Sequence, residues 1–197
     1  FTWTRPLTGT PNGDAPSLLN SSYTFKAEVE IPQGGAEGML ITQGGRFGGY
    51  GFYLQKGKPV FLWNLVDLKR IRWEGPVLSP GKHTLEFDFK YAGLGAGTMA
   101  FGSYAGIGQG GTGVLKVDGK DVDTQKMEHT LPFILQWDEA LDIGSDTGSP
   151  VNDADYQPPF AFTGKLNKIT LTIDRPKLSP EDIKKLEAAQ RNNKVSE

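Results

Sequence analysis

Two short motifs in this sequence match patterns that carry chemistry in other proteins. The stretch YAGIGQGGTGVLKVDG places Gly106, Gly108 and Gly111 in the G-x-G-x-x-G spacing that cradles a dinucleotide. That chemistry needs a helix directly after the last glycine, because the free N–H groups of a helix N-terminus bind the pyrophosphate. Here the glycines run into VLKVDG, a β-branched run followed by a strong hairpin-turn pair. The stretch therefore predicts a glycine-rich loop leading into a β-hairpin, without a nucleotide site.

The second motif, DTGS at Asp146 to Ser149, matches the segment around a catalytic aspartate of aspartic proteases. Protease chemistry requires two such aspartates in one site, and the sequence contains a single copy of the motif. We therefore interpret Asp146 as a residue that caps a turn with Gly148, after the short strand ALDIG.

Acidic residues are concentrated between Asp138 and Asp155. Loop carboxylates can hold calcium, which takes about six to eight oxygen ligands. One hypothesis is therefore a structural calcium, the only cofactor the sequence suggests, held by Asp142, Asp146, Asp153 and Asp155. The spacing matches no EF-hand loop, and the alternative is a solvated acidic loop without a metal.

Aromatic and basic residues gather in the middle of the sequence. An exposed aromatic ring can stack on a sugar, and a basic side chain can bind an anionic group on a glycan. This pattern suggests a carbohydrate-binding surface, to which we assign Tyr53, Trp63, Trp73, Arg46, Arg70 and Arg72, with Lys69 beside them. The alternative is that the large aromatics fill the core between two sheets.

The elements that would position these residues are β-strands. YTFKAEVEI, HTLEFDFKY and ITLTI alternate apolar and polar residues, which is typical of strands with one face in water. From the apolar positions we predict core residues at Phe25, Val29, Phe87, Phe89 and Leu171. Residues 59–66 are apolar on both faces, which indicates either a central strand in a packed stack or a strand that is half core and half binding surface.

About nine or ten strands with turn signals between them predict a sandwich or a barrel. A helix is expected only near the end, where Ser179 can cap it and Pro180 occupies its first position. We therefore expect a β-domain over residues 1–176 and a C-terminal helix and tail over residues 177–197.

Composition excludes several function classes. The chain has 197 residues, a net charge of −2 with mixed signs, and no cysteine. The charge argues against nucleic acid as a partner, and the missing cysteine excludes disulfides and thiolate chemistry. No apolar run approaches the length of a membrane span.

Several segments together resemble the C-terminal, non-catalytic region of long bacterial arylsulfatases. They are LLNSSYTFKAEVEIP, EGMLITQGGRFGGYGFYLQKGKP, GKHTLEFDFKY, GVLKVDGKDV, ALDIGSDTGSPV and FAFTGKLNKITLTI, within about Pro16 to Asp174. The resemblance implies an all-β, antiparallel jelly-roll β-sandwich of the concanavalin A-like (laminin G-like) type. It also implies a sulfatase catalytic domain as the partner, and a periplasmic or extracellular location.

No catalytic residue follows from the resemblance. Sulfatases use a Cys or Ser in a C-x-P-x-R or S-x-P-x-R motif, and no segment of this sequence fits either pattern. We therefore expect a non-catalytic accessory module that packs on the catalytic domain and frames its substrate entrance. One alternative is a carbohydrate-binding module, for instance for sulfated glycans. Another is a glycan hydrolase of the same fold, for which Glu86 and Asp88 share a face without a third acid.

Overall fold

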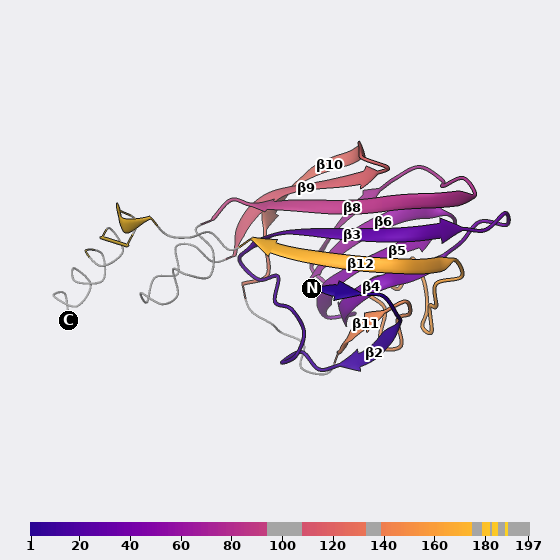
Figure 1. Cartoon of the computed structure of the whole chain (residues 1–197). Helices are drawn as coiled ribbons and strands as arrows, with labels where there is room; N and C mark the ends of the chain where they lie inside the picture. Colours follow the sequence, from indigo (N-terminus) through magenta and orange to yellow (C-terminus); the bar gives the residue numbers. More distant parts are fainter. Residues whose placement is uncertain (94–107, 133–138, 175–178, 182, 185–187, 189–197) are drawn as a thin grey trace.

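The computed structural model describes residues 1–93, 108–132, 139–174, 179–181, 183, 184 and 188. Within these residues the strands form two antiparallel sheets that stack face to face (Figure 1). Sheet A has the order β1 (Thr2–Trp3), β12 (Lys165–Asp174), β3 (Ser22–Ile31), β8 (Gly81–Tyr91), β9 (Gln109–Val117) and β10 (Lys120–His129). Sheet B has the order β2 (Leu7–Thr10), β11 (Leu141–Ile143), β4 (Gly38–Gly45), β5 (Gly48–Gln55), β6 (Lys58–Leu65) and β7 (Lys69–Glu74). The predicted antiparallel sandwich is confirmed.

Alternation along the strands places one set of side chains between the two sheets. The predicted core is confirmed, since each of its members is at most 1% exposed: Phe25, Val29, Phe87, Phe89 and Leu171. Phe61 of β6 stacks on Phe87 of β8 with ring centroids 3.6 Å apart, so this contact joins the sheets directly. The indole N–H of Trp73 donates to the carbonyl of Gly113 at 2.9 Å, which satisfies its one polar atom.

Two tight turns follow the sequence signals. Asp118 and Gly119 both have positive φ, 51° and 79°, and join β9 to β10 as predicted. Lys56 and Gly57 make the equivalent turn between β5 and β6. Gly111 lies inside β9, so a strand and not a helix follows the glycine motif, as predicted. Gly106 lies outside the described residues.

A long connection between β11 and β12, residues 144–164, lies over the outer face of sheet B; we call it the strap. Its Val151, Tyr156 and Phe160 form a second apolar cluster with Met39, Tyr53, Val60 and Leu62 of the sheet. Backbone hydrogen bonds between Asp146 and Phe160, 3.0 and 3.3 Å long, close the strap on itself. The strap explains why β6 is apolar on both faces: each face is covered, one by sheet A and one by the strap.

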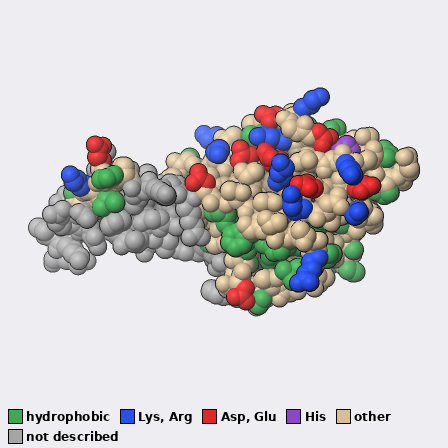
Figure 2. Space-filling view, in the orientation of Figure 1, with side chains coloured by type: hydrophobic (Ala, Val, Ile, Leu, Met, Phe, Trp, Pro, Cys, Tyr) green, Lys and Arg blue, Asp and Glu red, His purple; other side chains and the backbone are tan. Residues whose placement is uncertain are grey.

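The outer face of sheet A is polar. Figure 2 shows basic and acidic side chains intermingled over the face that β12, β3 and β8 form. Cross-strand neighbours of opposite charge pair there, as in Lys168–Glu28 at 2.8 Å and Lys116–Glu86 at 3.4 Å. Glu86 and Asp88, the acids considered for a hydrolase, belong to this face; Asp88 accepts a hydrogen bond from the Thr24 hydroxyl.

The C-terminal helix begins after Ser179, whose carbonyl accepts the N–H of Ile183 at 3.0 Å. Its described helical positions are 180, 181, 183, 184 and 188. The boundary near residue 176 adjoins residues outside the described set, so the division into two parts stays a prediction.

In the described part of the chain, no helix has the length and apolar character needed to cross a membrane.

We expect Phe87→Ala to lower the free energy of unfolding by about 3–5 kcal/mol, because the variant leaves a cavity beneath the ring of Phe61. Urea unfolding monitored by circular dichroism measures this loss. Lys90→Ala, at the exposed end of the same strand, serves as the control and should change stability by less than about 0.5 kcal/mol. A loss below about 1 kcal/mol for Phe87→Ala would contradict the core assignment.

Candidate functional site

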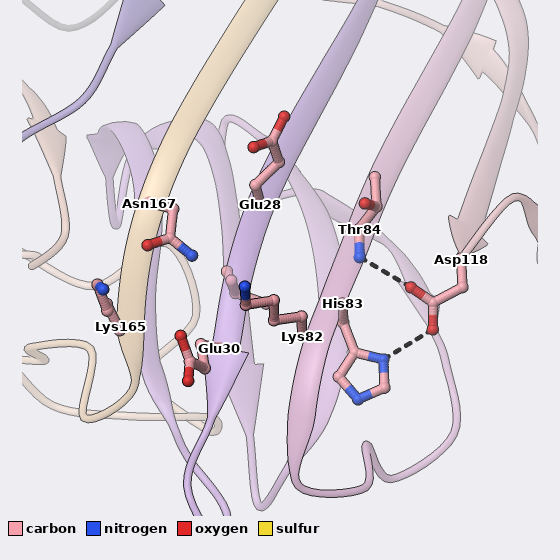
Figure 3. Close-up of a pocket in the computed structure, with 9 residues that line it drawn as sticks. Glu28, Glu30, Lys82, His83, Thr84, Asp118, Lys165 and Asn167 are labelled. Atoms are coloured by element: carbon pink, nitrogen blue, oxygen red, sulfur yellow. Dashed lines mark hydrogen bonds and ion pairs between the residues drawn. The ribbon is translucent and has the colours of Figure 1, made fainter.

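A polar hollow of about 410 Å³ lies at the end of sheet A where β3 ends and β8 and β12 begin (Figure 3). Three strands and one turn supply its walls. They contribute Glu28, Val29 and Glu30 from β3, Lys82, His83 and Thr84 from β8, Lys165 and Asn167 from β12, and Asp118 from the β9–β10 turn. The antiparallel register places Glu28, Glu30, Lys82 and Thr84 on the outer face, because residues paired across neighbouring strands face the same side of the sheet.

A row of three charges crosses the hollow. Glu30 on β3 is the register partner of both Lys82 on β8 and Lys165 on β12. Elsewhere on this face, two such neighbours form ion pairs, Lys116 with Glu86 and Lys168 with Glu28. Among the described residues, however, no hydrogen bond or ion pair reaches the charged ends of Glu30, Lys82 and Lys165. Two donors and one acceptor therefore remain free for a ligand.

Asn167 occupies a β-bulge beside this row. The β12–β3 register passes from Leu166↔Val29 to Lys168↔Glu28, which leaves Asn167 as the extra residue. Bulges redirect side chains and are frequent next to functional sites. The amide of Asn167 lines the hollow and brings one more acceptor and a two-proton donor.

His83 and Asp118 form the opposite wall (Figure 3). The imidazole Nδ1 lies 2.7 Å from Asp118 Oδ2, and Nε2 lies 2.8 Å from the carbonyl oxygen of Ser79. Asp118 also accepts the backbone N–H of Thr84 at 2.8 Å. Partial burial lowers the pKa of His83, but the hydrogen bonds to Asp118 and Ser79 outweigh it and leave the pKa raised above its usual value. The wall is therefore a rigid pair that can carry a positive charge.

This arrangement is suited to binding polar groups. It combines ammonium donors, carboxylate acceptors and an amide in a space of the size that small-molecule sites occupy. Such groups hydrogen-bond readily to hydroxyls, and a sugar presents several hydroxyls in fixed directions.

The aromatic part of the sequence-predicted carbohydrate surface is corrected by the structure. Tyr53 and Trp73 are fully buried and Trp63 is 7% exposed, so none of them offers a ring face to a sugar. Trp63 and Trp73 point between the sheets, where the indole N–H of Trp63 donates to the Tyr23 hydroxyl at 2.6 Å. Tyr53 lies under the strap. The reason is packing: Trp63 and Trp73 fill the core between the sheets, as the alternative expected, and Tyr53 is buried in the second apolar cluster.

The basic residues assigned to that surface are already paired with acidic side chains. Arg46, Arg70 and Arg72 lie on the strap side of sheet B. Arg46 forms a bidentate pair with Asp153, Arg70 pairs with Asp67 and Arg72 pairs with Asp155 and Glu74. Lys69 pairs with Glu128 at 3.3 Å.

The four aspartates assigned to calcium do not converge on one point. Asp153 and Asp155 turn to arginines, whereas Asp142 accepts hydrogen bonds from Gly9 N–H and from the backbone and hydroxyl of Thr147. Asp146 accepts the Tyr156 hydroxyl at 2.5 Å and the N–H of Gly148 at 3.0 Å, so it caps a turn as interpreted. In the described residues, no three His, Cys, Asp or Glu side chains gather as a metal site. The geometry therefore provides no common ligand set for calcium.

Sequence reasoning missed the residues of the hollow. One signal was present: in KLNKITLTI the apolar residues Leu166 and Ile169 are three positions apart, whereas the following ones alternate. A break of this kind indicates a bulge. The row of Glu30, Lys82 and Lys165 gives no such signal, because it arises from pairing between distant strands.

No family model and no curated protein matches this chain. Among solved structures, the chain is similar to Ruminococcus gnavus IT-sialidase CBM40 bound to alpha2,6 sialyllactose, with a TM-score of 0.54 and 11% identity over 95% of this chain and 98% of that one. For the same CBM40 bound to alpha2,3 sialyllactose the TM-score is 0.52, with 12% identity over 96% and 97% of the two chains. For mouse laminin alpha1 chain domains LG4-5 the TM-score is 0.46, with 13% identity over 87% of this chain and 40% of that one.

At these identities the likeness to CBM40 shows the fold alone. Together with the two antiparallel sheets, it shows an antiparallel jelly-roll β-sandwich, the fold that the sequence resemblance implied. The arylsulfatase parentage stays a prediction.

The His83–Asp118 pair should make stability depend on pH. Because the pKa of His83 is raised in the folded state, its contribution is fully present below about pH 6.5 and is lost as pH rises through the folded-state pKa. We expect the stability advantage of the wild type over His83→Gln to shrink as pH rises above about 6.5. Urea unfolding at several pH values measures it. Asp118→Asn should lower the pKa of His83 in an NMR titration, and an unchanged pKa would contradict the pairing.

Asp146 should also make the folded protein less stable as pH rises, at a lower pH than His83 does. Burial raises its pKa to about 6, only partly opposed by the hydrogen bonds from Tyr156 and Gly148. Stability from the protonated carboxyl is therefore full below about pH 4 and is lost as pH rises through about 6, by at most about 3 kcal/mol. Asp146→Asn should remove this slope, while Asp121→Asn on exposed β10 should leave it. If the free energy of unfolding changes with pH equally in the wild type and in Asp146→Asn, Asp146 is not the source of the pH dependence.

Proposed function

We propose that this chain is a non-catalytic module that binds carbohydrate in the hollow of sheet A. The observation that carries the proposal is the row of Glu30, Lys82 and Lys165. These opposite charges are direct cross-strand neighbours, yet no hydrogen bond or ion pair within the described residues joins them. Beside them, the bulge brings the amide of Asn167 to the same hollow.

The ligand class follows from the groups that line the hollow. Hydroxyls can accept from the two ammonium groups and donate to the carboxylate of Glu30, while Asn167 serves either role. The two lysines outnumber the carboxylate of the row, which favours a saccharide with one acidic group. The CBM40 with the same fold is bound to sialyllactose, a saccharide of this kind, and the two chains align over nearly their whole lengths. This likeness supports the proposal.

The second candidate is an accessory role in an exported bacterial arylsulfatase, in the periplasm or outside the cell. It is favoured by where the resembling segments fall: they form β3, the β4–β5 hairpin, β8, the β9–β10 hairpin, β11 and β12. These strands are the framework of the sandwich. In this role the module packs on the catalytic domain and frames its substrate entrance, and neither role gives this chain a reaction of its own.

Calorimetric titration with sialyllactose, and with lactose as the uncharged comparison, tests carbohydrate binding. We expect sialyllactose to bind, and Lys82→Ala and Asn167→Ala each to weaken binding about tenfold, because each removes a charged or bidentate hydrogen-bonding group. Lys126→Ala, an exposed lysine on β10, is the matched control and should bind as the wild type does.

Three outcomes would count against the proposal. They are no binding to either sugar, equal binding by all variants, and equal loss in the Lys126→Ala control. Thermal melts of each variant identify a loss that comes from unfolding.

A further inference from the structure

The acidic strap and the basic face of sheet B form one network. Asp153 pairs with Arg46, Asp155 pairs with Arg72, and the carbonyl of Val151 accepts the Nε–H of Arg70 at 3.2 Å. The residues assigned from sequence to a metal site and to a glycan site thus bind one another. The strap carboxylates stand where the anionic groups of an external ligand would stand.

The two ion pairs differ in how firmly they are held. The Arg72–Asp155 pair is largely covered, with exposed side-chain fractions of 27% and 11%, and Arg72 also donates to Gln55 and Glu74. The Arg46–Asp153 pair is open to solvent, at 48% and 42%. Exposed ion pairs are weak because water and salt screen them. Asp155 therefore anchors the strap, whereas the side chain of Asp153 can leave Arg46 without opening the second apolar cluster.

The backbone of Arg46 is fixed for binding. Its N–H donates to the Ser149 hydroxyl at 3.1 Å, and its carbonyl accepts the amide of buried Asn64 at 2.8 Å. Asn64 also accepts the N–H of Asp67, so one buried side chain ties together the tips of the β4–β5 and β6–β7 hairpins. The guanidinium of Arg46 is thereby presented from a rigid tip.

The geometry at Arg46 is that of carboxylate recognition. Its Nε and Nη2 donate to the two oxygens of Asp153 at 2.8 and 2.7 Å, a fork that also fits sulfate. The hydrogen bond from Arg46 lowers the pKa of Asp153. Phe47, next along the chain, is 71% exposed.

We propose that Arg46 forms a second binding site, for the sulfate or carboxylate groups of an acidic polysaccharide, and that Asp153 fills this site as an internal ligand. An arriving anionic group replaces Asp153 on Arg46, while Asp155 keeps the strap in place. The site lies on sheet B, so it is independent of the hollow on sheet A.

Chromatography on immobilised dextran sulfate and on immobilised polygalacturonate tests this site and separates sulfate from carboxylate recognition. We expect Asp153→Ala to bind about tenfold more tightly than Asp121→Ala, which removes the same charge from an exposed position on β10. Adding Arg46→Gln to Asp153→Ala should abolish the gain. Equal retention of the two single variants on both matrices would show that only net charge matters and would overturn the proposal.

A measurement on the unaltered protein covers the case in which Asp153→Ala unfolds. The NMR signal of the Arg46 Nε–H should move on titration with soluble dextran sulfate or polygalacturonate, while that of Arg72 should stay in place. Absence of binding to both polymers, or binding that leaves the Arg46 signal unchanged, would refute the site.

Discussion

The stack of Phe61 on Phe87 is the contact on which the arrangement of the molecule depends. It joins β6 to β8 across the sandwich, and Trp73 packs against the same ring with centroids 4.8 Å apart. The contact leaves no room at Gly113, where a Cβ would lie 2.6 Å from Trp73 and 2.7 Å from Phe87. Once these rings meet, strand alternation decides which residues face outward on each sheet. Both candidate sites are therefore consequences of core packing.

The outer faces of the two sheets differ in how they meet water. Sheet A carries charges that pair across strands, so it faces water without a cover. Sheet B carries Met39, Val60 and Leu62 outward and needs the strap to bury them. An apolar cover has to be held at its edges as well, and the largely covered ion pair between Arg72 and Asp155 provides that hold. On sheet B, an ion pair thus holds a cover over apolar side chains. On sheet A, paired charges face water and no cover is needed.

Much of this fold could be predicted from local patterns. Alternation in YTFKAEVEI and HTLEFDFKY was enough to assign Phe25 and Phe87 to the core, and Asp118-Gly119 was enough to place a turn. The sites could not be predicted this way. Trp73 and Tyr53 have the same residue chemistry whether they face a sugar or a core, and only their packing partners distinguish the two. The pairing of Glu30 with Lys82 and Lys165 depends on register between distant strands, which no local spacing encodes.

The contrast between paired and unpaired charges explains why the hollow differs from an ordinary solvated surface. Cross-strand neighbours of opposite charge attract, and Lys168–Glu28 shows that side chains on this face can reach each other. Glu30 has a lysine on both sides and forms neither pair. The bulge at Asn167 lies directly between these two rows, because it shifts the β12 register from one row to the next. The inserted residue therefore lies between the paired row of Lys168 and Glu28 and the unpaired row of Lys165 and Glu30.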